Sequence, residues 1–206
     1  MSVLMLSTVL GSYLLGAVPF GVLVARILGA GDIRQQGSGN IGATNVLRVA
    51  GRKAGAMVLL LDMAKGALAA WVGMMLFGAD SRVTAAVVFL VFLGHLYPIY
   101  LGFKGGKGVA VALGAVLVWI PGIGLFFALI WLVSAWWFRI SSLAALLGFG
   151  SAWMALFWMP GPPDGLVTWG LMTLLVFWRH RDNMRRLLQG TEPTIGQKRS
   201  PTPDET

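Results

Sequence analysis

The sequence predicts an all-α polytopic membrane protein with seven transmembrane helices, an N-terminus outside and a cytoplasmic C-terminus. Three observations lead to this class. The 206 residues are 57% hydrophobic and only 12% charged, with a mean hydropathy of +0.76. Long apolar segments recur along the chain, and each crossing needs about 20 apolar residues because lipid offers backbone groups no water to bond. Finally, most cations fall on one side of the membrane when the crossings are counted.

Seven hydrophobic segments follow one another. The first contains Pro19 beside Gly21 and is expected to bend there. It carries no cation before its apolar run, unlike a cleaved signal peptide. The fourth is short for a full crossing and is expected to be tilted or embedded, with Pro121-Gly122 separating it from the fifth. The segments are 3–28, 54–77, 83–101, 109–120, 123–138, 143–158 and 166–178.

The cations set the orientation. With the N-terminus outside, the outer loops contain one cation, Arg82, beside Asp80 and Asp164. Joining the fourth and fifth segments into one crossing would move the C-terminal cations outside, against the positive-inside rule. We therefore expect one catalytic membrane domain over residues 1–190 and a disordered cytoplasmic tail over 191–206. The inner loops hold Arg34, Arg48, Arg52, Lys53, Lys104, Lys107, Arg139, Arg179, Arg181, Arg185 and Arg186.

Composition excludes several classes of function. There is no cysteine, so neither disulfides nor thiolate metal sites are available. Two histidines make a dedicated metal centre unexpected. The net charge of +8 follows membrane topology and attraction to anionic lipid, so no nucleic-acid partner is predicted. The nine tryptophans lie mostly near segment ends, as interfacial anchors do.

Three polar stretches interrupt the apolar chain, and the crossing count puts all three on the cytoplasmic face. The first, residues 37–45, matches a dinucleotide fingerprint in its letters, but no strand precedes it. Its glycine N–H groups and its hydroxyl and amide side chains instead favour an anion nest. Arg48 would join them if the segment is helical. The alternative is a flexible loop capped by Ser and Asn.

The second stretch, residues 102–108, places two lysines among four glycines. It fails the P-loop spacing, because Gly108 stands where Ser or Thr would hold magnesium. Glycine N–H groups, a helix start and two lysines still predict an anion site. Alternatively, the two lysines only belong to the excess of cations that membrane topology places in cytoplasmic loops.

The third stretch, residues 179–183, begins at the inner end of the last segment. A kinase catalytic loop is excluded, because Leu187 stands where Asn is required. If the helix continues, Arg179, Asn183 and Arg186 share a face that suits a phosphate or a carbonyl. A basic helix binding anionic lipid is the alternative.

Two ionic residues, Asp62 and Lys65, lie midway along the second segment at i,i+3. Each costs about 2.5–3.5 kcal/mol at that depth, so we expect them to pair and face a polar cavity. A structural role and a role in the site both stay open. The His-x-x-x-x-Asp dyad of other acyltransferases is absent, because Tyr100 follows His95 and Arg185 follows His180 at that spacing.

Together the stretches resemble the three motifs of the acylphosphate-dependent glycerol-3-phosphate acyltransferase family, PlsY. The matching parts are 38–45, then Gly94-His95 with Pro98 and 103–110, then Arg179-His180 with Asn183 and 186–190 with Glu192. The segment containing Asp62 and Lys65 also looks like a family feature. Met184, where the family often has isoleucine, is a mild departure.

The resemblance implies a bacterial inner-membrane enzyme with its active site on the cytoplasmic side. It would transfer a fatty acyl group from acyl phosphate to the 1-hydroxyl of glycerol 3-phosphate, giving lysophosphatidic acid and inorganic phosphate. A separate phosphate acyltransferase would supply the donor. No cofactor and no metal are expected, because acyl phosphate is already activated. The donor's own phosphate is expected to accept the hydroxyl proton, because no Ser-His-Asp arrangement is visible.

The site residues follow from the motifs and the resemblance. In the family the second motif is linked to glycerol 3-phosphate, so its glycines and lysines are expected to bind that phosphate. The first motif would orient the donor, and the third would complete the site. The expected catalytic residues are Ser38, Arg48, Lys104, His180 and Asn183, and the expected substrate-binding residues are Gly37, Gly39, Asn40, Gly42, Thr44, Asn45, His95, Gly105, Gly106, Lys107 and Gly108.

Two other classes remain as alternatives. A transporter of phosphorylated small molecules could use the intramembrane Asp62 and Lys65 to line a path. Against it, the polar stretches share one face and the two halves show no clear repeat. An alcohol phosphotransferase would need clustered aspartates with a divalent metal, and the inner loops offer only Asp32 and Asp182.

Overall fold

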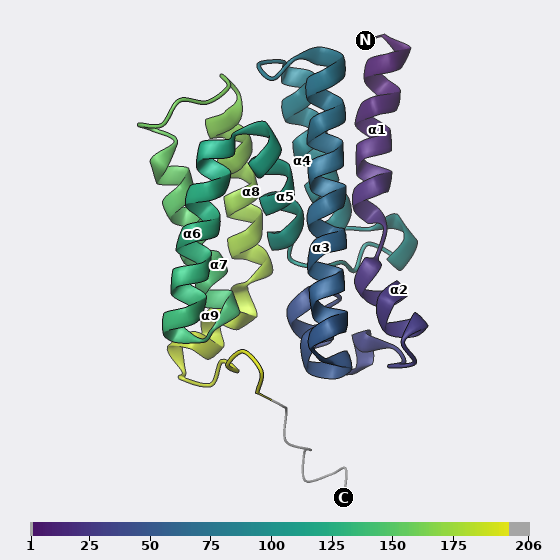
Figure 1. Cartoon of the computed structure of the whole chain (residues 1–206), viewed down its shortest axis with the longest axis vertical. Coiled ribbons are helices and arrows are strands. Elements are labelled where there is room, and N and C mark those ends of the chain that lie inside the picture. Colours follow the sequence, from purple (N-terminus) through teal and green to yellow (C-terminus); the bar gives the residue numbers. More distant parts are fainter. Residues whose placement is uncertain (1, 198–206) are drawn as a thin grey trace, which may run out of the picture.

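The computed structural model describes residues 2–197, which fold into helices joined by short loops (Figure 1). This confirms the all-α class. The elements of this part of the chain are α1 (Val3–Ala17), α2 (Phe20–Ile27), η1 (Ile33–Gln35), α3 (Ala43–Phe77), α4 (Arg82–Leu96), η2 (Ile99–Leu101), α5 (Val109–Trp119), α6 (Pro121–Phe138), α7 (Ser141–Ala155), α8 (Gly165–Arg179) and α9 (Arg181–Leu188), where η marks a 3-10 helix.

The helices form two groups with α5 between them (Figure 1). In the first group α1 packs on α4 and α3 packs on α5; in the second α6 packs on α7. Small residues allow the close approach of α3 and α5. A Cβ on Gly114 would lie 1.9 Å from the carbonyl oxygen of Met63, and one on Gly66 would lie 2.1 Å from that of Val111. Such contacts are typical of helices that associate in lipid.

Aromatic rings fill the centre of the second group. Phe127 of α6 meets Phe149 of α7 edge-on, with ring centroids 4.9 Å apart. Phe149 in turn stacks on Trp169 of α8, with centroids 4.8 Å apart. The rings of Phe127 and Phe149 are completely buried, so they fix α6, α7 and α8 against one another.

Each of the seven predicted hydrophobic segments coincides with helical structure, but one boundary differs. The first segment consists of α1 and α2, which meet at a bend of 41°. The bend lies at Pro19, as predicted. The second segment is longer than predicted, because α3 already begins at Ala43 and continues through one non-helical residue, Gly51. Arg48 therefore lies on the helix one turn after Thr44.

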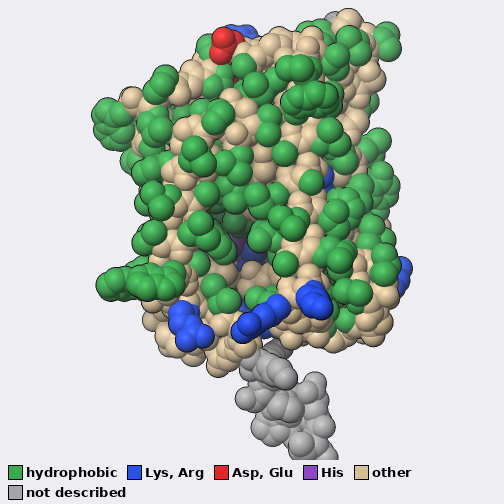
Figure 2. Space-filling view, in the orientation of Figure 1, with side chains coloured by type: hydrophobic (Ala, Val, Ile, Leu, Met, Phe, Trp, Pro, Cys, Tyr) green, Lys and Arg blue, Asp and Glu red, His purple; other side chains and the backbone are tan. Residues whose placement is uncertain are grey.

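Three helices in the described part of the chain are long and apolar enough to cross a membrane, or four if the bent α1–α2 pair is one span. The helices α5, α7 and α8 are apolar but shorter. Figure 2 shows hydrophobic side chains over the visible flank and Lys and Arg gathered at the end that carries α9. The fold is that of a multi-pass membrane protein; the count of seven crossings and the orientation stay predictions.

Candidate active site

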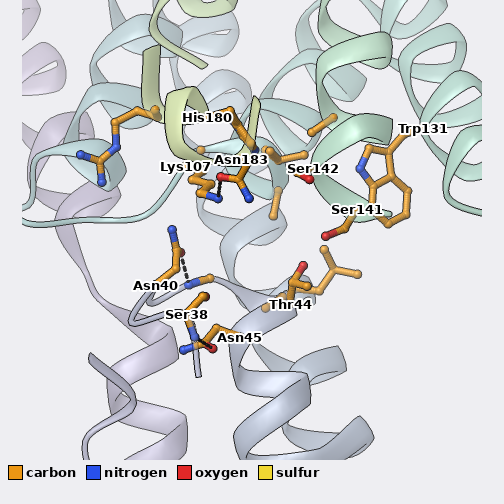
Figure 3. A pocket seen from close by; sticks show the side chains of 18 of the residues that line it. Ser38, Asn40, Thr44, Asn45, Lys107, Trp131, Ser141, Ser142, His180 and Asn183 are labelled. Atoms are coloured by element: carbon orange, nitrogen blue, oxygen red, sulfur yellow. Dashed lines mark hydrogen bonds between the residues drawn. The ribbon is translucent and has the colours of Figure 1, made fainter. Parts of the chain in front are cut away.

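The three polar stretches meet at one cavity of about 1,120 Å³. Residues of α3, α5, α6 and α7 and of the α8–α9 junction line it (Figure 3). Lys104 and Gly106 are the two predicted site residues that do not line it. Those that do are Gly37, Ser38, Gly39, Asn40, Gly42, Thr44, Asn45, Arg48, His95, Gly105, Lys107, Gly108, His180 and Asn183.

In the first stretch the two asparagines hold the backbone. The Asn45 Oδ1 atom accepts the Ser38 N–H at 2.8 Å, and its Nδ2 donates to the carbonyls of Ile33 and Gln36, each at 3.1 Å. Both polar atoms of the Asn45 side chain therefore form hydrogen bonds that stabilise the loop. Asn40 Oδ1 accepts the Gly42 N–H at 2.8 Å, forming a local turn.

Two hydroxyls and one guanidinium of this stretch are available to a ligand. The hydroxyls of Ser38 and Thr44 make no hydrogen bond with any residue in the range 2–197. The Nε of Arg48 is buried and also has no partner in that range. An unpartnered buried N–H is costly, so this arrangement favours an anionic ligand next to Arg48.

The glycine loop differs from the prediction in how its backbone is used. The Gly105 N–H donates to the Leu96 carbonyl at 3.1 Å and the Gly106 N–H donates to the His95 carbonyl at 3.0 Å. Their own carbonyls accept from Arg179, at 2.6 and 3.1 Å. These two N–H groups are therefore engaged within the protein and are not available to the anion predicted to bind this loop.

Glycine is required in this loop for close packing. A Cβ on Gly106 would lie 2.1 Å from Nε2 of His95, and Gly108 has a φ of +82° with Phe92 2.3 Å from where its Cβ would be. The N-terminus of α5, where Val109 and Ala110 line the cavity, supplies N–H groups in their place. First-turn N–H groups lack helical partners and attract anions.

Of the two lysines, Lys107 faces the cavity and Lys104 is exposed. The Lys107 ammonium donates to Oδ1 of Asn183 (Figure 3). Burial, opposed in part by the carboxylate of Glu192, lowers the pKa of Lys107 to about 8. The charge of Lys107 therefore changes near physiological pH.

His180 lies at the α8–α9 junction, where its Nδ1 is 2.8 Å from the carbonyl oxygen of Val176. A carbonyl can only accept, so Nδ1 carries the proton and Nε2 keeps its lone pair. Burial, together with the nearby ammonium of Lys107, lowers the pKa of His180 to about 4. His180 is therefore a neutral hydrogen-bond acceptor at neutral pH.

Glu192 was not among the predicted site residues, although it ends the third motif. Its carboxylate accepts from Ser142 at 2.7 Å, from Asn183, and from Arg186 at 2.7 Å. Burial raises the pKa of Glu192, but these hydrogen bonds outweigh it and hold the pKa below its ordinary value. Within the predicted tail, residues 191–197 are thus described and Glu192 contacts the site; residues 198–206 lie outside the described part.

Two other lining residues were not among the predicted site residues. Ser142 and Trp131 come from α7 and α6, outside the three stretches. The indole Nε1 of Trp131 is buried and unpartnered within the described chain. For Ser142, the pair of serines at the inner end of an apolar segment could have indicated a site residue. Trp131 was expected to act as an interfacial anchor.

The charge of the cavity is mainly positive. Two of its carboxylates have close cations, since Glu192 binds Arg186 and Asp62 pairs with Lys65. Within residues 2–197 the cations Arg48 and Lys107 form no ion pair with a carboxylate. Among residues 2–197, no three His, Cys, Asp or Glu side chains are grouped as metal ligands would be.

The remainder of the cavity is apolar and opens on the flank. Figure 2 shows this hollow between hydrophobic side chains, with basic side chains inside it. An amphiphile with an anionic head and an alkyl chain matches this division. The apolar lining includes Leu59, Met63, Leu113, Leu117, Phe127 and Leu132.

The sequence of this chain is similar to those of known proteins. The family model described as glycerol-3-phosphate acyltransferase matches residues 6–190. The proteins of that name from Agrobacterium fabrum and Maricaulis maris are 49% and 46% identical, over 96% of this chain and 94% and 90% of theirs.

Two crystal structures of PlsY, an integral membrane glycerol 3-phosphate acyltransferase, have the same fold. The glycerol 3-phosphate form is 43% identical with a TM-score of 0.89, over 93% of this chain and 96% of that one. The lysophosphatidic acid form is 42% identical with a TM-score of 0.87, over 93% and 95%. This chain belongs to the glycerol-3-phosphate acyltransferase family.

Proposed function

We propose that the protein transfers a fatty acyl group from acyl phosphate to the sn-1 hydroxyl of glycerol 3-phosphate. The products are lysophosphatidic acid and inorganic phosphate. The observation that carries this proposal is the cavity itself, in which Arg48 and Lys107, without an ion-pair partner among residues 2–197, lie with a large apolar lining. The glycerol 3-phosphate and lysophosphatidic acid forms of PlsY support the acceptor and the product.

Two phosphates must lie close together, and the cavity offers two groups of donors. One is Arg48 with the free hydroxyls of Ser38 and Thr44, which suits the donor phosphate. The other is Lys107 with the first turn of α5, which suits glycerol 3-phosphate. Holding both substrates in one orientation replaces the encounter in solution and supplies much of the acceleration.

The chemical step needs no enzyme nucleophile, because acyl phosphate is an activated mixed anhydride. The acceptor hydroxyl attacks the acyl carbon, the bond to the phosphate oxygen breaks, and the hydroxyl proton moves to the phosphate. Nε2 of His180 accepts a hydrogen bond from the hydroxyl and orients it. With its pKa near 4, His180 is a weaker base than a phosphate, whose second pKa is about 6. The donor phosphate is therefore the proton acceptor.

The setting of this reaction is the bacterial inner membrane. We expect seven crossings, an N-terminus outside and the cavity at the cytoplasmic face, because the cations gather at that end of the molecule (Figure 2). Glycerol 3-phosphate then arrives from the cytoplasm and the acyl chain lies in the lipid-facing channel. The donor is made by a separate phosphate acyltransferase, and membrane lipid receives the product.

The test is turnover by the purified protein in lipid with palmitoyl phosphate, labelled glycerol 3-phosphate and EDTA. We expect lysophosphatidic acid acylated at the 1-position, and none when palmitoyl-CoA replaces palmitoyl phosphate. A folded protein that uses palmitoyl-CoA instead would overturn the donor assignment. Absence of product from both donors, with uptake of glycerol 3-phosphate into liposomes, would favour the transporter.

A further inference from the structure

A buried ionic cluster forms part of the cavity wall, where Asp62 and His95 line it, and no step of the reaction uses it. It consists of Asp62 and Lys65 on α3 and His95 on α4, whose exposed fractions are 2%, 3% and 5%. The Lys65 ammonium forms an ion pair with Asp62, at 2.8 Å from Oδ1, and donates to the Val18 carbonyl oxygen at 2.9 Å. Its nitrogen lies 3.0 Å from His95 Nδ1, which in turn lies 3.6 Å from Asp62 Oδ1.

On one side Lys65 contacts the break between α1 and α2. Its ammonium binds the Val18 carbonyl at the bend and lies 5.5 Å from the ring centre of Phe20, the first residue of α2. The helix α2 supports the first polar stretch. Gly21 is so close to that stretch that a Cβ would lie 1.8 Å from the Ile41 carbonyl oxygen. Residues of α2 share a hydrophobic cluster with Ile33 and Ile41.

On the other side Lys65 contacts His95, which packs against the glycine loop. Since the ammonium can only donate, His95 Nδ1 accepts and Nε2 carries the ring proton. The Nε2 edge lies against Gly106, whose N–H binds the His95 carbonyl. Turning or tilting this ring would therefore displace the loop that leads to Lys107 and to α5.

The cluster thus connects the supports of the two phosphate subsites. The first stretch with Arg48 rests on α2, and the glycine loop with Lys107 rests on His95; Lys65 contacts both supports. We propose that Lys65 is a positioning residue for acyl transfer, which fixes the separation of the two substrates by joining the α1–α2 break to His95. This inference rests on the proposed function, because it presumes a two-phosphate reaction.

The test rests on a charge-neutral double variant, which leaves no unpaired buried charge. Removing one partner of a buried ion pair strands the other, whereas replacing both is tolerated much better. The main variant is therefore Asp62→Asn with Lys65→Met, measured beside the single Lys65→Met. Lys53→Met, at an exposed position of the same helix, is the matched control. For each purified protein we measure thermal unfolding, kcat, and KM for each substrate.

We expect kcat of the double variant to fall about 100-fold, the effect of misplacing reactants by about 1 Å. Each KM should stay within about threefold of wild type, because each subsite is built by its own loop. A double variant with wild-type kcat overturns the inference, and so does a raised KM with unchanged kcat. Failure of the double variant to fold overturns it as well, since the cluster would then serve stability. Wild-type turnover in the same assay tests the proposed function separately.

Discussion

Raising the pH is a direct probe of Lys107. Only its charged form binds phosphate strongly, and burial has lowered its pKa to about 8. The charge is present below that value and is lost as the pH rises through it. At pH 9 about one molecule in ten keeps the charge, so kcat/KM for glycerol 3-phosphate should fall about tenfold for each further unit. The substrate phosphate, with a second pKa of about 6, is doubly charged over the range of this decrease, above pH 8.

The assay measures initial rates from pH 6 to pH 10 with glycerol 3-phosphate well below its KM. Spontaneous hydrolysis of acyl phosphate is subtracted from each rate. Lys107→Arg should remove the alkaline decrease, because a guanidinium stays charged over this range. Only the position of the decrease is compared, since arginine does not reproduce the geometry of lysine.

The matched control is Lys104→Arg, at the exposed lysine of the same loop. We expect its pH profile to coincide with that of the wild type. An alkaline decrease that persists unchanged in Lys107→Arg would refute the reasoning, because another group would then be titrating. A wild-type profile without any decrease before pH 10 would show that Lys107 is not held near pKa 8.

Three further results are expected. Lys107→Met should lower kcat/KM at least about 100-fold, whereas Lys104→Met should stay within about twofold, as measured at pH 7; equal losses would contradict the geometry. His180→Ala should lower kcat about 10- to 100-fold, and a loss of four or more decades would instead make His180 the general base. The pH profile of the wild-type enzyme should show no acid-side pKa near 6.5 from this residue. Gly106→Ala should lower the melting temperature, because the new methyl group would overlap His95, and an unchanged melting curve would disprove that contact.

Hydropathy predicted the helices well because lipid imposes one requirement on every crossing. The bend at Pro19 was also predicted, and the Lys65 ammonium, distant in sequence, binds the Val18 carbonyl there. The start of α3 was missed. This helix begins at Ala43, in the first polar stretch, and has a kink at the non-helical Gly51 before its apolar part.

The sequence predicted which residues line the cavity better than it predicted their contacts. Glycines and lysines in one loop indicated an anion site, and the loop does line the cavity. Which N–H groups are free depends on partners elsewhere, here the carbonyls of His95 and Leu96. Which lysine faces the cavity likewise depends on the turn before α5. No pattern within the loop contains this information, so Lys104 and Lys107 could not be told apart.

The charges of the cavity suggest how it holds two phosphates without holding the products too tightly. A fully charged and desolvated cluster of cations would bind inorganic phosphate strongly and slow its release. Here Glu192 offsets Arg186, and Lys107 has a pKa close to ambient pH, so its charge is only partly retained when the site is empty. An arriving dianion raises that pKa and draws a proton onto the lysine. Binding of glycerol 3-phosphate should therefore take up a proton near pH 8, by an amount that calorimetry in buffers of different ionisation enthalpy can measure.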